Sequence, residues 1–134
     1  MNDCLFCKII RGEIPSHKIY EDNTFLVILD IFAATKGHAL ILPKRHATNL
    51  YELNEGESAE LIPLAKKIAE KISNTLNPDG LNILQNNGKA AGQEVFHYHM
   101  HIIPRYNDDG IKFLKSAPQT PQDVLEKLAK ELKT

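Results

Sequence analysis

Residues 97–103 read His-Tyr-His-Met-His-Ile-Ile, and this alternation constrains the fold more than any other stretch of the chain. In a β-strand successive side chains point to opposite faces, so the three histidines would share one face while Tyr98, Met100 and Ile102 pack on the other. Core packing gives no reason to place three imidazoles in a row. Histidine is the side chain whose ordinary pKa lies nearest neutrality, so such a face suits proton transfer, nucleophilic attack or metal binding. A solvated edge strand that happens to carry histidine is the plainer alternative.

A long amphipathic helix is predicted between residues 54 and 76. Asn54 and Glu57 have the spacing of a capping box, and apolar residues recur at helical spacing through the rest of the segment. Pro63 fits this helix poorly, because an internal proline removes a backbone hydrogen bond and usually kinks the axis. The helix therefore either starts later than residue 54 or bends at Pro63.

The other predicted elements are short. Helices are expected over 3–11 and from about residue 120, and strands over 17–21, 25–30, 38–43, 81–86 and 94–103. The apolar run in the second of these strands predicts burial on both faces. The order and the short connections favour an α+β class, an antiparallel β-sheet with a long central helix plus short N-terminal and C-terminal helices. The length suits a single domain over residues 1–134, with 105–134 as its C-terminal segment.

Composition excludes several classes of protein. The formal net charge is -1, which argues against nucleic acid or an anionic membrane as the main partner. The chain has no apolar run of membrane-spanning length, and its first residues lack the basic and apolar regions of a signal peptide. A cytoplasmic location is therefore expected.

Cys4 and Cys7 form a C-x-x-C motif, a spacing at which two thiolates can bind one zinc ion. A four-coordinate structural site needs two more ligands, and because the chain has no other cysteines, these would be histidines. A redox dithiol and two inert buried cysteines are the alternatives.

The histidine segment resembles the histidine triad (HIT) family, whose pattern is His-φ-His-φ-His-φ-φ with φ an apolar residue. The resemblance spans roughly residues 3–104 and is carried further by residues 29–30, 37–46, 82–88 and 91–96. The sequence is most similar to the bacterial branch of nucleotide-binding, phosphoramidase-like members. The resemblance implies a HIT-like fold and a homodimer in which two protomers pair through the long helix and a strand edge.

The resemblance also implies a reaction at the α-phosphate of a nucleotide. His99 would be the nucleophile and would form a covalent nucleotidyl-imidazole intermediate that water then cleaves. His101 would bind phosphate oxygens and help move the leaving-group proton. His97 completes the triad, and His38 matches a fourth histidine beside it. Purely structural roles for His101 and His38 are the alternatives.

A set of nucleotide-binding residues is implied in the same way. Asp30 would accept hydrogen bonds from the ribose hydroxyls, with a turn aspartate as the plainer reading. The backbone around Gly92 can approach a phosphate closely. Glu94 stands where some family members carry serine, which bears on the choice of leaving group. The full implied set is Asp30, Asn86, Gly92, Gln93, Glu94, Val95, His99 and His101.

Relatives with a C-x-x-C motif pair it with two histidines, which correspond here to His46 and His97. The resemblance therefore implies one zinc ion per chain, held by Cys4, Cys7, His46 and His97. A site closed by four protein ligands leaves no open coordination position, so this zinc would be structural.

Three functions remain open at this point. The first is hydrolysis of purine nucleoside 5′-phosphoramidates, conjugates of AMP or GMP. The second is hydrolysis of dinucleoside polyphosphates by the same nucleophile, and the third is a nucleotide-binding or scaffold protein with little turnover. The intact triad favours an enzyme.

Overall fold

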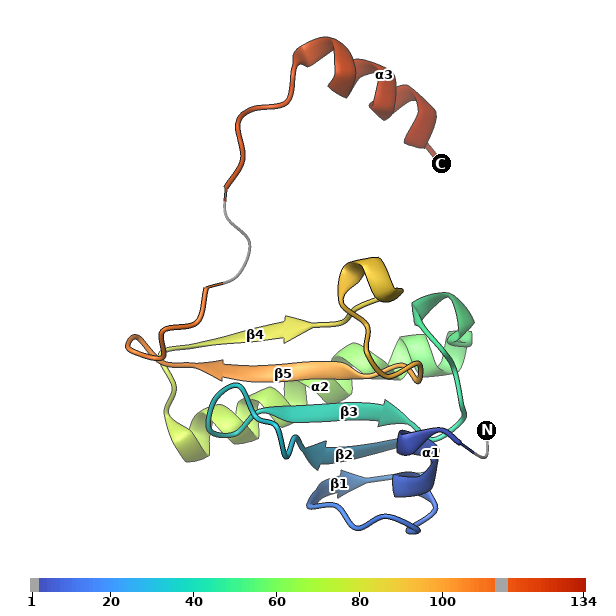
Figure 1. Ribbon diagram of the computed structural model, residues 1–134, viewed down its shortest axis with the longest axis vertical. Helices are drawn as coiled ribbons and strands as arrows, with labels where there is room; N and C mark the ends of the chain where they lie inside the picture. The colour runs from blue at the N-terminus through green and yellow to red at the C-terminus, as the bar shows by residue number, and fades with distance from the viewer. Residues whose placement is uncertain (1–2, 113–115) are drawn as a thin grey trace.

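A five-stranded antiparallel sheet lies at the centre of the protein, with its strands in the order β1-β2-β3-β5-β4 (Figure 1). The computed structural model describes residues 3–112 and 116–134. The strands are β1 Lys18–Glu21, β2 Phe25–Leu29, β3 Ala39–Pro43, β4 Gly80–Leu84 and β5 Met100–Arg105. The helices are α1 Leu5–Ile10, α2 Glu55–Leu76 and α3 Gln122–Leu132, with short 3-10 turns η1 Leu50–Glu52 and η2 Lys89–Ala91. The predicted α+β class, antiparallel sheet, long central helix and short terminal helices are confirmed.

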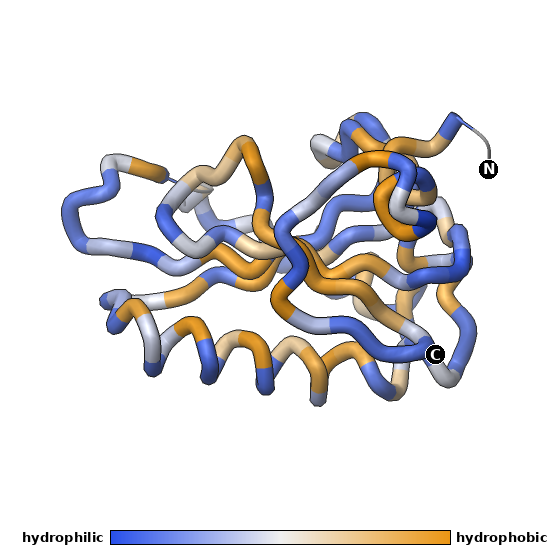
Figure 2. Tube along the Cα trace, turned by 90° about the horizontal axis from the view of Figure 1, so that it is seen from below, coloured by the Kyte–Doolittle hydropathy of each residue, from blue (hydrophilic) through white to orange (hydrophobic). Residues whose placement is uncertain are grey.

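The long helix α2 covers one face of the sheet (Figure 2). The Asn54 side chain accepts from the Glu57 N–H (2.8 Å) and the Glu57 carboxylate accepts from the Asn54 N–H (2.9 Å), so the capping box is confirmed. The alternative of a later helix start is wrong, because α2 continues without a break through Pro63. Pro63 lies on the exposed side of α2, where water can hydrate the carbonyl that it leaves without a partner. The side chains packed on the sheet are Leu61, Leu64, Ala65, Ile68 and Ile72.

Strand β2 is buried on both faces, as its apolar run predicts. Phe25 and Val27 pack in the cluster that faces α2, whereas Leu26 and Ile28 pack with Phe6 and other residues on the α1 side. Leu29, the last residue of the strand, is partly exposed. Strands β2 and β3 are thus held between two helical layers, and the centre of the sheet is a rigid support for the segments at its ends.

The histidine strand is shorter than predicted. Strand β5 begins at Met100, so His101 lies in it while His97 and His99 precede it. The reason lies in the neighbouring strand β3, which pairs with residues 100–102. The residues before Met100 face the turn that follows β3, where the Tyr98 N–H donates to the Ala47 carbonyl outside the regular ladder. The alternation of side chains is nevertheless confirmed for Tyr98, Met100 and Ile102, which are all buried in the core against α2.

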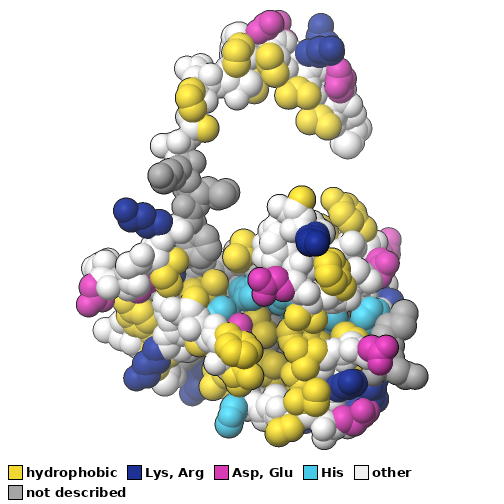
Figure 3. All heavy atoms as spheres, viewed as in Figure 1, with side chains coloured by type: hydrophobic (Ala, Val, Ile, Leu, Met, Phe, Trp, Pro, Cys, Tyr) yellow, Lys and Arg dark blue, Asp and Glu magenta, His cyan; other side chains and the backbone are white. Residues whose placement is uncertain are grey.

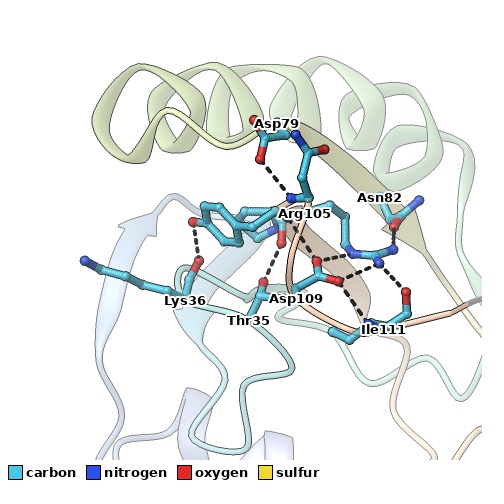
Figure 4. Close-up of polar contacts among 10 residues, drawn as sticks. Thr35, Lys36, Asp79, Asn82, Arg105, Asp109 and Ile111 are labelled. Atoms are coloured by element: carbon cyan, nitrogen blue, oxygen red, sulfur yellow. Dashed lines mark hydrogen bonds and ion pairs between the residues drawn. The ribbon is translucent and has the colours of Figure 1, made fainter.

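A polar clamp closes the far end of β5 (Figure 4). The Arg105 guanidinium donates from Nε to Asp109 (2.8 Å), from one terminal nitrogen to Asn82 (2.8 Å) and from the other to the Ile111 carbonyl (2.7 Å). The side-chain hydrogen bond from Arg105, the largest cause, holds the pKa of Asp109 well below its ordinary value. Arg105 therefore fixes the turn after the sheet, from which the C-terminal segment departs.

The helix α3 stands apart from the body of the protein (Figure 1). Pro121 occupies its N-cap, so the helix begins at Gln122, slightly later than the predicted start near residue 120. Among the described residues, 3–112 and 116–134, no helix combines the length and apolar character needed to cross a bilayer. The assignment of residues 1–134 to one domain stays a prediction.

Candidate active site and metal centre

His99 lies in the extended segment just before β5 and is partly buried. Its Nδ1 is 2.8 Å from the His97 carbonyl oxygen. Because a carbonyl oxygen only accepts, Nδ1 carries the proton and Nε2 keeps its lone pair. Phe6 of α1 meets the imidazole edge-on, with the ring centroids 5.0 Å apart. Burial lowers the pKa of His99, which keeps the ring neutral near pH 7.

His101 and His38 form a hydrogen-bonded pair from neighbouring strands. The Ala34 backbone N–H donates to His38 Nδ1 (2.9 Å), which places the proton of the neutral His38 ring on Nε2. His38 Nε2 is 2.9 Å from His101 Nδ1 and therefore donates to it. The remaining proton of the neutral His101 ring is on Nε2. His101 therefore has one free N–H to donate, and its ring lies next to that of His99, with the two ring centroids 5.0 Å apart.

Asp30 lies directly after β2 beside this pair. One carboxylate oxygen is 3.5 Å from His38 Nε2, and the other accepts from the Phe32 N–H (2.8 Å). Burial is the largest cause acting on the pKa of His38 and lowers it, while the Asp30 charge opposes the shift. The structure thus brings Asp30, His38 and His101 together at one side of the triad.

The pKa of His101 gives a test of this burial. Burial lowers it from the ordinary value of 6.5 to about 4. A histidine with a lower pKa in the folded state contributes stability above pH 6.5 that is lost as the pH falls toward 4, because the unfolded chain binds the proton first. We expect the free energy of unfolding to fall more steeply over this range in the wild type than in His101→Asn. Chemical denaturation at several pH values measures both slopes, and equal slopes would show that the folded pKa is not lowered.

The loop between β4 and β5 lies next to the triad. Gly92 has a φ of +95°, a conformation that favours glycine, and its carbonyl accepts from the Asn86 side chain (3.5 Å). Gln93 is buried: its side-chain oxygen accepts from the Gly88 N–H (2.8 Å) and its amide donates to the Thr48 (2.6 Å) and Val95 (3.2 Å) carbonyls. Gln93 therefore holds this loop in place, and a direct contact with phosphate would require one of these bonds to break.

Glu94 is exposed and lines an open cavity of about 520 Å³ together with Val95 and Phe96. The opposite wall comes from α1 and from the turn after β3, where Leu5 and His46 lie. A carboxylate at the edge of this cavity favours cationic groups there. The lining of this cavity also includes Cys4 and His46, two members of the cysteine and histidine cluster at α1.

Four side chains gather at the N-terminal end of α1 with the spacing of a tetrahedral metal site: Cys4, Cys7, His46 and His97. Their ligand atoms all lie within 4.8 Å of one another. The Cys7 sulfur is 3.3 Å from His46 Nδ1 and 3.5 Å from His97 Nδ1, and the Cys4 sulfur is 3.4 Å from His97 Nδ1. A zinc ion bound by both sulfur and nitrogen separates such atoms by about 3.5 Å. The four predicted ligands are thus brought together and can hold a metal ion.

The proton on His97 is placed to allow this coordination. His97 Nε2 is 2.8 Å from the Pro43 carbonyl, so Nε2 donates and Nδ1 turns its lone pair toward the two sulfurs. Cys4 is also the N-cap of α1, where its sulfur accepts from the Cys7 N–H (3.4 Å), so the helix begins later than the predicted range of 3–11. His97, one of the four residues that could hold a metal ion, thus also provides the carbonyl that orients His99.

Three groups that shape the site were not predicted. Phe6 packs against the nucleophile candidate, the Ala34 N–H sets the proton position on His38, and the Pro43 carbonyl does the same for His97. Two of these are backbone groups, which leave no mark in the sequence. Phe6 lies between Cys4 and Cys7 in the sequence. Its contact with the triad could have been predicted only from the proposal that these two cysteines share a metal ion with His97.

The sequence matches the HIT domain family over residues 11–108. It is 46% identical to protein hit of Bacillus subtilis, with 97% of this chain and 94% of that protein covered. It is 42% identical to adenosine 5′-monophosphoramidase of Schizosaccharomyces pombe, with 90% of each covered. The geometry and these matches define a histidine triad protein, and the chain belongs to the HIT family.

Solved structures agree with this assignment. A Streptococcus mutans protein has a TM-score of 0.93 and 44% identity, with 98% of this chain and 84% of that chain covered. A histidine triad nucleotide-binding protein from Candida albicans has a TM-score of 0.88 and 37% identity, with coverage of 97% and 94%. A zinc-bound histidine triad protein from Mycobacterium smegmatis has a TM-score of 0.78 and 37% identity, with coverage of 97% and 98%. The HIT fold predicted from the triad is confirmed.

Proposed function

We propose that this protein hydrolyses purine nucleoside 5′-phosphoramidates, or related nucleotidyl conjugates, at the α-phosphate through a covalent intermediate on His99. The observation that carries the proposal is the bond from His99 Nδ1 to the His97 carbonyl, which leaves Nε2 as a neutral, unprotonated nucleophile. The phosphoramidase of S. pombe, 42% identical, supports this class of substrate.

The proposed reaction has two displacements. In the first, His99 Nε2 forms a bond to the α-phosphorus while the P–N bond breaks, and a protonated phosphoramidate nitrogen leaves as a neutral amine. In the second, water attacks the nucleotidyl-imidazole, releases the monophosphate and returns His99 to its neutral form. His101 donates its Nε2 hydrogen bond to a phosphoryl oxygen in both steps, since His38 already occupies its Nδ1.

The other predicted residues are assigned to substrate binding. Asp30 binds the ribose hydroxyls, Asn86 and the backbone from Gly92 to Val95 surround the phosphate, and Glu94 faces the leaving group. Asp30 is supported by its place next to His38, whose Nε2 is 3.5 Å from the carboxylate, and Glu94 by its exposed position at the edge of a cavity. The carboxylate of Glu94 favours amines over anions as leaving groups.

Asp30 provides a test of the ribose assignment. The wild type should favour a ribonucleotide over its 2′-deoxy analogue by about tenfold or more in kcat/KM, because the deoxy substrate leaves a carboxylate lone pair without a donor. The Asp30→Asn variant should lose most of this preference. Steady-state rates with both substrates give the ratio, which does not depend on a general loss of activity. A preference that persists in the variant would remove Asp30 from the ribose site.

We also propose one structural zinc ion per chain, a homodimer and a cytoplasmic location. Cys4, Cys7, His46 and His97 would hold the ion, whose role is to tie α1 to the segment that carries His99. The zinc-bound M. smegmatis protein supports this choice of metal. The homodimer would pair two protomers through α2 and the open edge of the sheet at β4.

Turnover of adenosine 5′-phosphoramidate, compared with that of a diadenosine polyphosphate, tests the function. Faster release of AMP from the phosphoramidate supports the proposal. A preference for the polyphosphate would make the protein a dinucleoside polyphosphate hydrolase with the same nucleophile. Binding of nucleotide without turnover of either substrate would instead indicate a nucleotide-binding or scaffold protein.

A further inference from the structure

Cys4 and Cys7 differ in their access to solvent. Cys7 is buried, whereas Cys4 is partly buried and lines the open cavity of about 520 Å³ beside α1. α1 packs on the face of the sheet opposite α2, and in Figure 3 histidine side chains reach the surface of this face between hydrophobic ones. A small reagent that enters the cavity therefore meets Cys4 before Cys7.

The two sulfurs are close enough to form a disulfide by rotation of their side chains. Cys4 is the N-cap of α1 and its sulfur accepts from the Cys7 N–H (3.4 Å), so both cysteines belong to one turn. Both sulfurs lie within 3.5 Å of His97 Nδ1 and within 4.8 Å of each other. Because the chain has no other cysteine, a disulfide within one chain can only join these two.

Two residues connect this pair of cysteines to the candidate nucleophile. Phe6, which lies between them in the sequence, meets the His99 ring edge-on at a centroid distance of 5.0 Å. His97, whose Nδ1 is next to both sulfurs, accepts a hydrogen bond from His99 Nδ1 at its carbonyl oxygen (2.8 Å). A disulfide would take two ligands from the proposed metal site and close a loop that contains Phe6. Both changes act on residues that orient His99.

The charges that line the cavity distinguish between oxidants. Asp3 and Glu94 both line it with exposed carboxylates, and no lysine or arginine of the described residues 3–112 and 116–134 does so. Carboxylates disfavour anionic oxidants such as glutathione disulfide, whereas a hydroperoxide is neutral at pH 7. Disulfides in a reducing compartment are usually transient and catalytic or redox-sensing. The cavity therefore favours a small neutral hydroperoxide as the reagent.

We propose that Cys4 and Cys7 form a reversible oxidation site for a neutral hydroperoxide, and that their disulfide releases the metal ion and slows the reaction at His99. The inference rests on the zinc site of the proposed function and adds a reagent that acts on it. A thiolate is both the metal ligand and the nucleophile of cysteine, so the bound state presents a reactive sulfur at Cys4. After oxidation only His46 and His97 remain to hold the ion.

The oxidation has two steps. In the first, the Cys4 sulfur forms a bond to one peroxide oxygen while the O–O bond breaks, and the other oxygen takes a proton and leaves as water or an alcohol. In the second, the Cys7 thiolate forms the S–S bond while the S–O bond on Cys4 breaks, and the hydroxide leaves as water after taking a proton. The two sulfurs together lose two electrons, which reduce the peroxide.

Limited treatment of the zinc-loaded full-length protein with hydrogen peroxide tests the site. The reaction should consume both thiols and release about one zinc ion per chain, measured by thiol counting and by a zinc-binding dye. Turnover of adenosine 5′-phosphoramidate should fall about tenfold or more, because His97, which orients His99, loses its metal ion. Reduction with dithiothreitol followed by addition of zinc should restore the thiols, the metal and the turnover.

Dimedone, which reacts with sulfenic acids, identifies the first sulfur to be oxidised. With dimedone in excess during peroxide treatment, the adduct should form on Cys4, because Cys7 is buried. Fragmentation of the N-terminal peptide in a mass spectrometer distinguishes the two positions. An adduct mainly on Cys7 would overturn the roles assigned to the two cysteines.

A charge-matched pair of alkylating reagents tests the route through the cavity. Glu94→Gln should lower the preference of Cys4 for neutral iodoacetamide over anionic iodoacetate by about twofold, because one of two nearby carboxylates is removed. Glu126→Gln makes the same charge change at an exposed position of α3 and should leave the preference unchanged. The same preference in both variants would overturn the cavity as the route to Cys4.

The readouts separate a failure of this inference from a failure of the proposed function. Zinc-loaded protein that keeps both thiols and its metal under peroxide would overturn the oxidation site and leave the structural zinc in place. A disulfide that forms while zinc is retained or turnover is unchanged would overturn the link to His99. A protein that binds no zinc in either redox state would overturn the zinc site and this inference together. Thiol loss and zinc release do not depend on turnover, so they test the oxidation site even if neither nucleotide substrate is hydrolysed.

Discussion

Replacing His99 with alanine should lower the turnover of adenosine 5′-phosphoramidate by about 10³-fold or more, while nucleotide binding changes little. His99 alone combines a lone pair at Nε2 with a carbonyl that holds the opposite proton, whereas His101 presents an N–H and His97 faces the cysteines. The remaining residues still surround the nucleotide. Release of the monophosphate gives the rate, and calorimetry with AMP gives the affinity.

The matched control for this variant is His17→Ala. His17 is an exposed histidine far along the chain from the triad, and its replacement should leave turnover unchanged. Zinc content and melting temperature should equal those of the wild type in both variants. Near-normal turnover by the folded His99→Ala protein would exclude His99 as the nucleophile.

Replacing Cys7 with serine should remove the metal ion and lower the melting temperature by about 10 °C or more. Cys7 is buried, and its sulfur lies within 3.5 Å of the Nδ1 atoms of His46 and His97. Without this thiolate only three of the four proposed ligands remain to bind the ion. The wild type should contain about one zinc per chain. Metal analysis and thermal unfolding measure the two effects.

A chelator separates the loss of metal from the loss of a buried side chain. The wild type without metal should melt close to Cys7→Ser, and a chelator should not lower the variant further. Turnover should also fall in the metal-free wild type, since His97 supplies the carbonyl that orients His99. A metal-free wild type that melts normally would show that the cluster is not a structural metal site.

The alternation around the triad predicted which side chains are buried, but it did not predict where the strand begins. Tyr98, Met100 and Ile102 lie in the core because burial depends on the side-chain pattern, which the sequence contains directly. The start of β5 at Met100 depends on where β3 ends, a long-range property. His97 lies before the strand, and its Nδ1 is within 3.5 Å of both cysteine sulfurs.

The residues of the site were predictable mainly from the family resemblance, whereas the hydrogen bonds that set their proton positions were not. The structure brings together the four predicted metal ligands, which lie up to 93 positions apart, and it places His38 beside His101 of the triad. The proton positions depend on the Ala34 N–H and the Pro43 and His97 carbonyls, which any residue type could provide. The hydrogen bonds of Arg105 were also missed, because Asp109 and the Ile111 carbonyl lie in a segment for which the sequence predicted no helix or strand.

The most direct test of the central proposal is to trap the intermediate. The wild type is mixed with adenosine 5′-phosphoramidate, quenched within milliseconds in alkaline denaturant, in which a phosphorus–imidazole bond survives better than in acid, and digested for mass spectrometry. The account predicts an adenylyl group on His99 that disappears on a longer delay. An adduct on His101 or His97, or turnover without any adduct in the wild type, would contradict it.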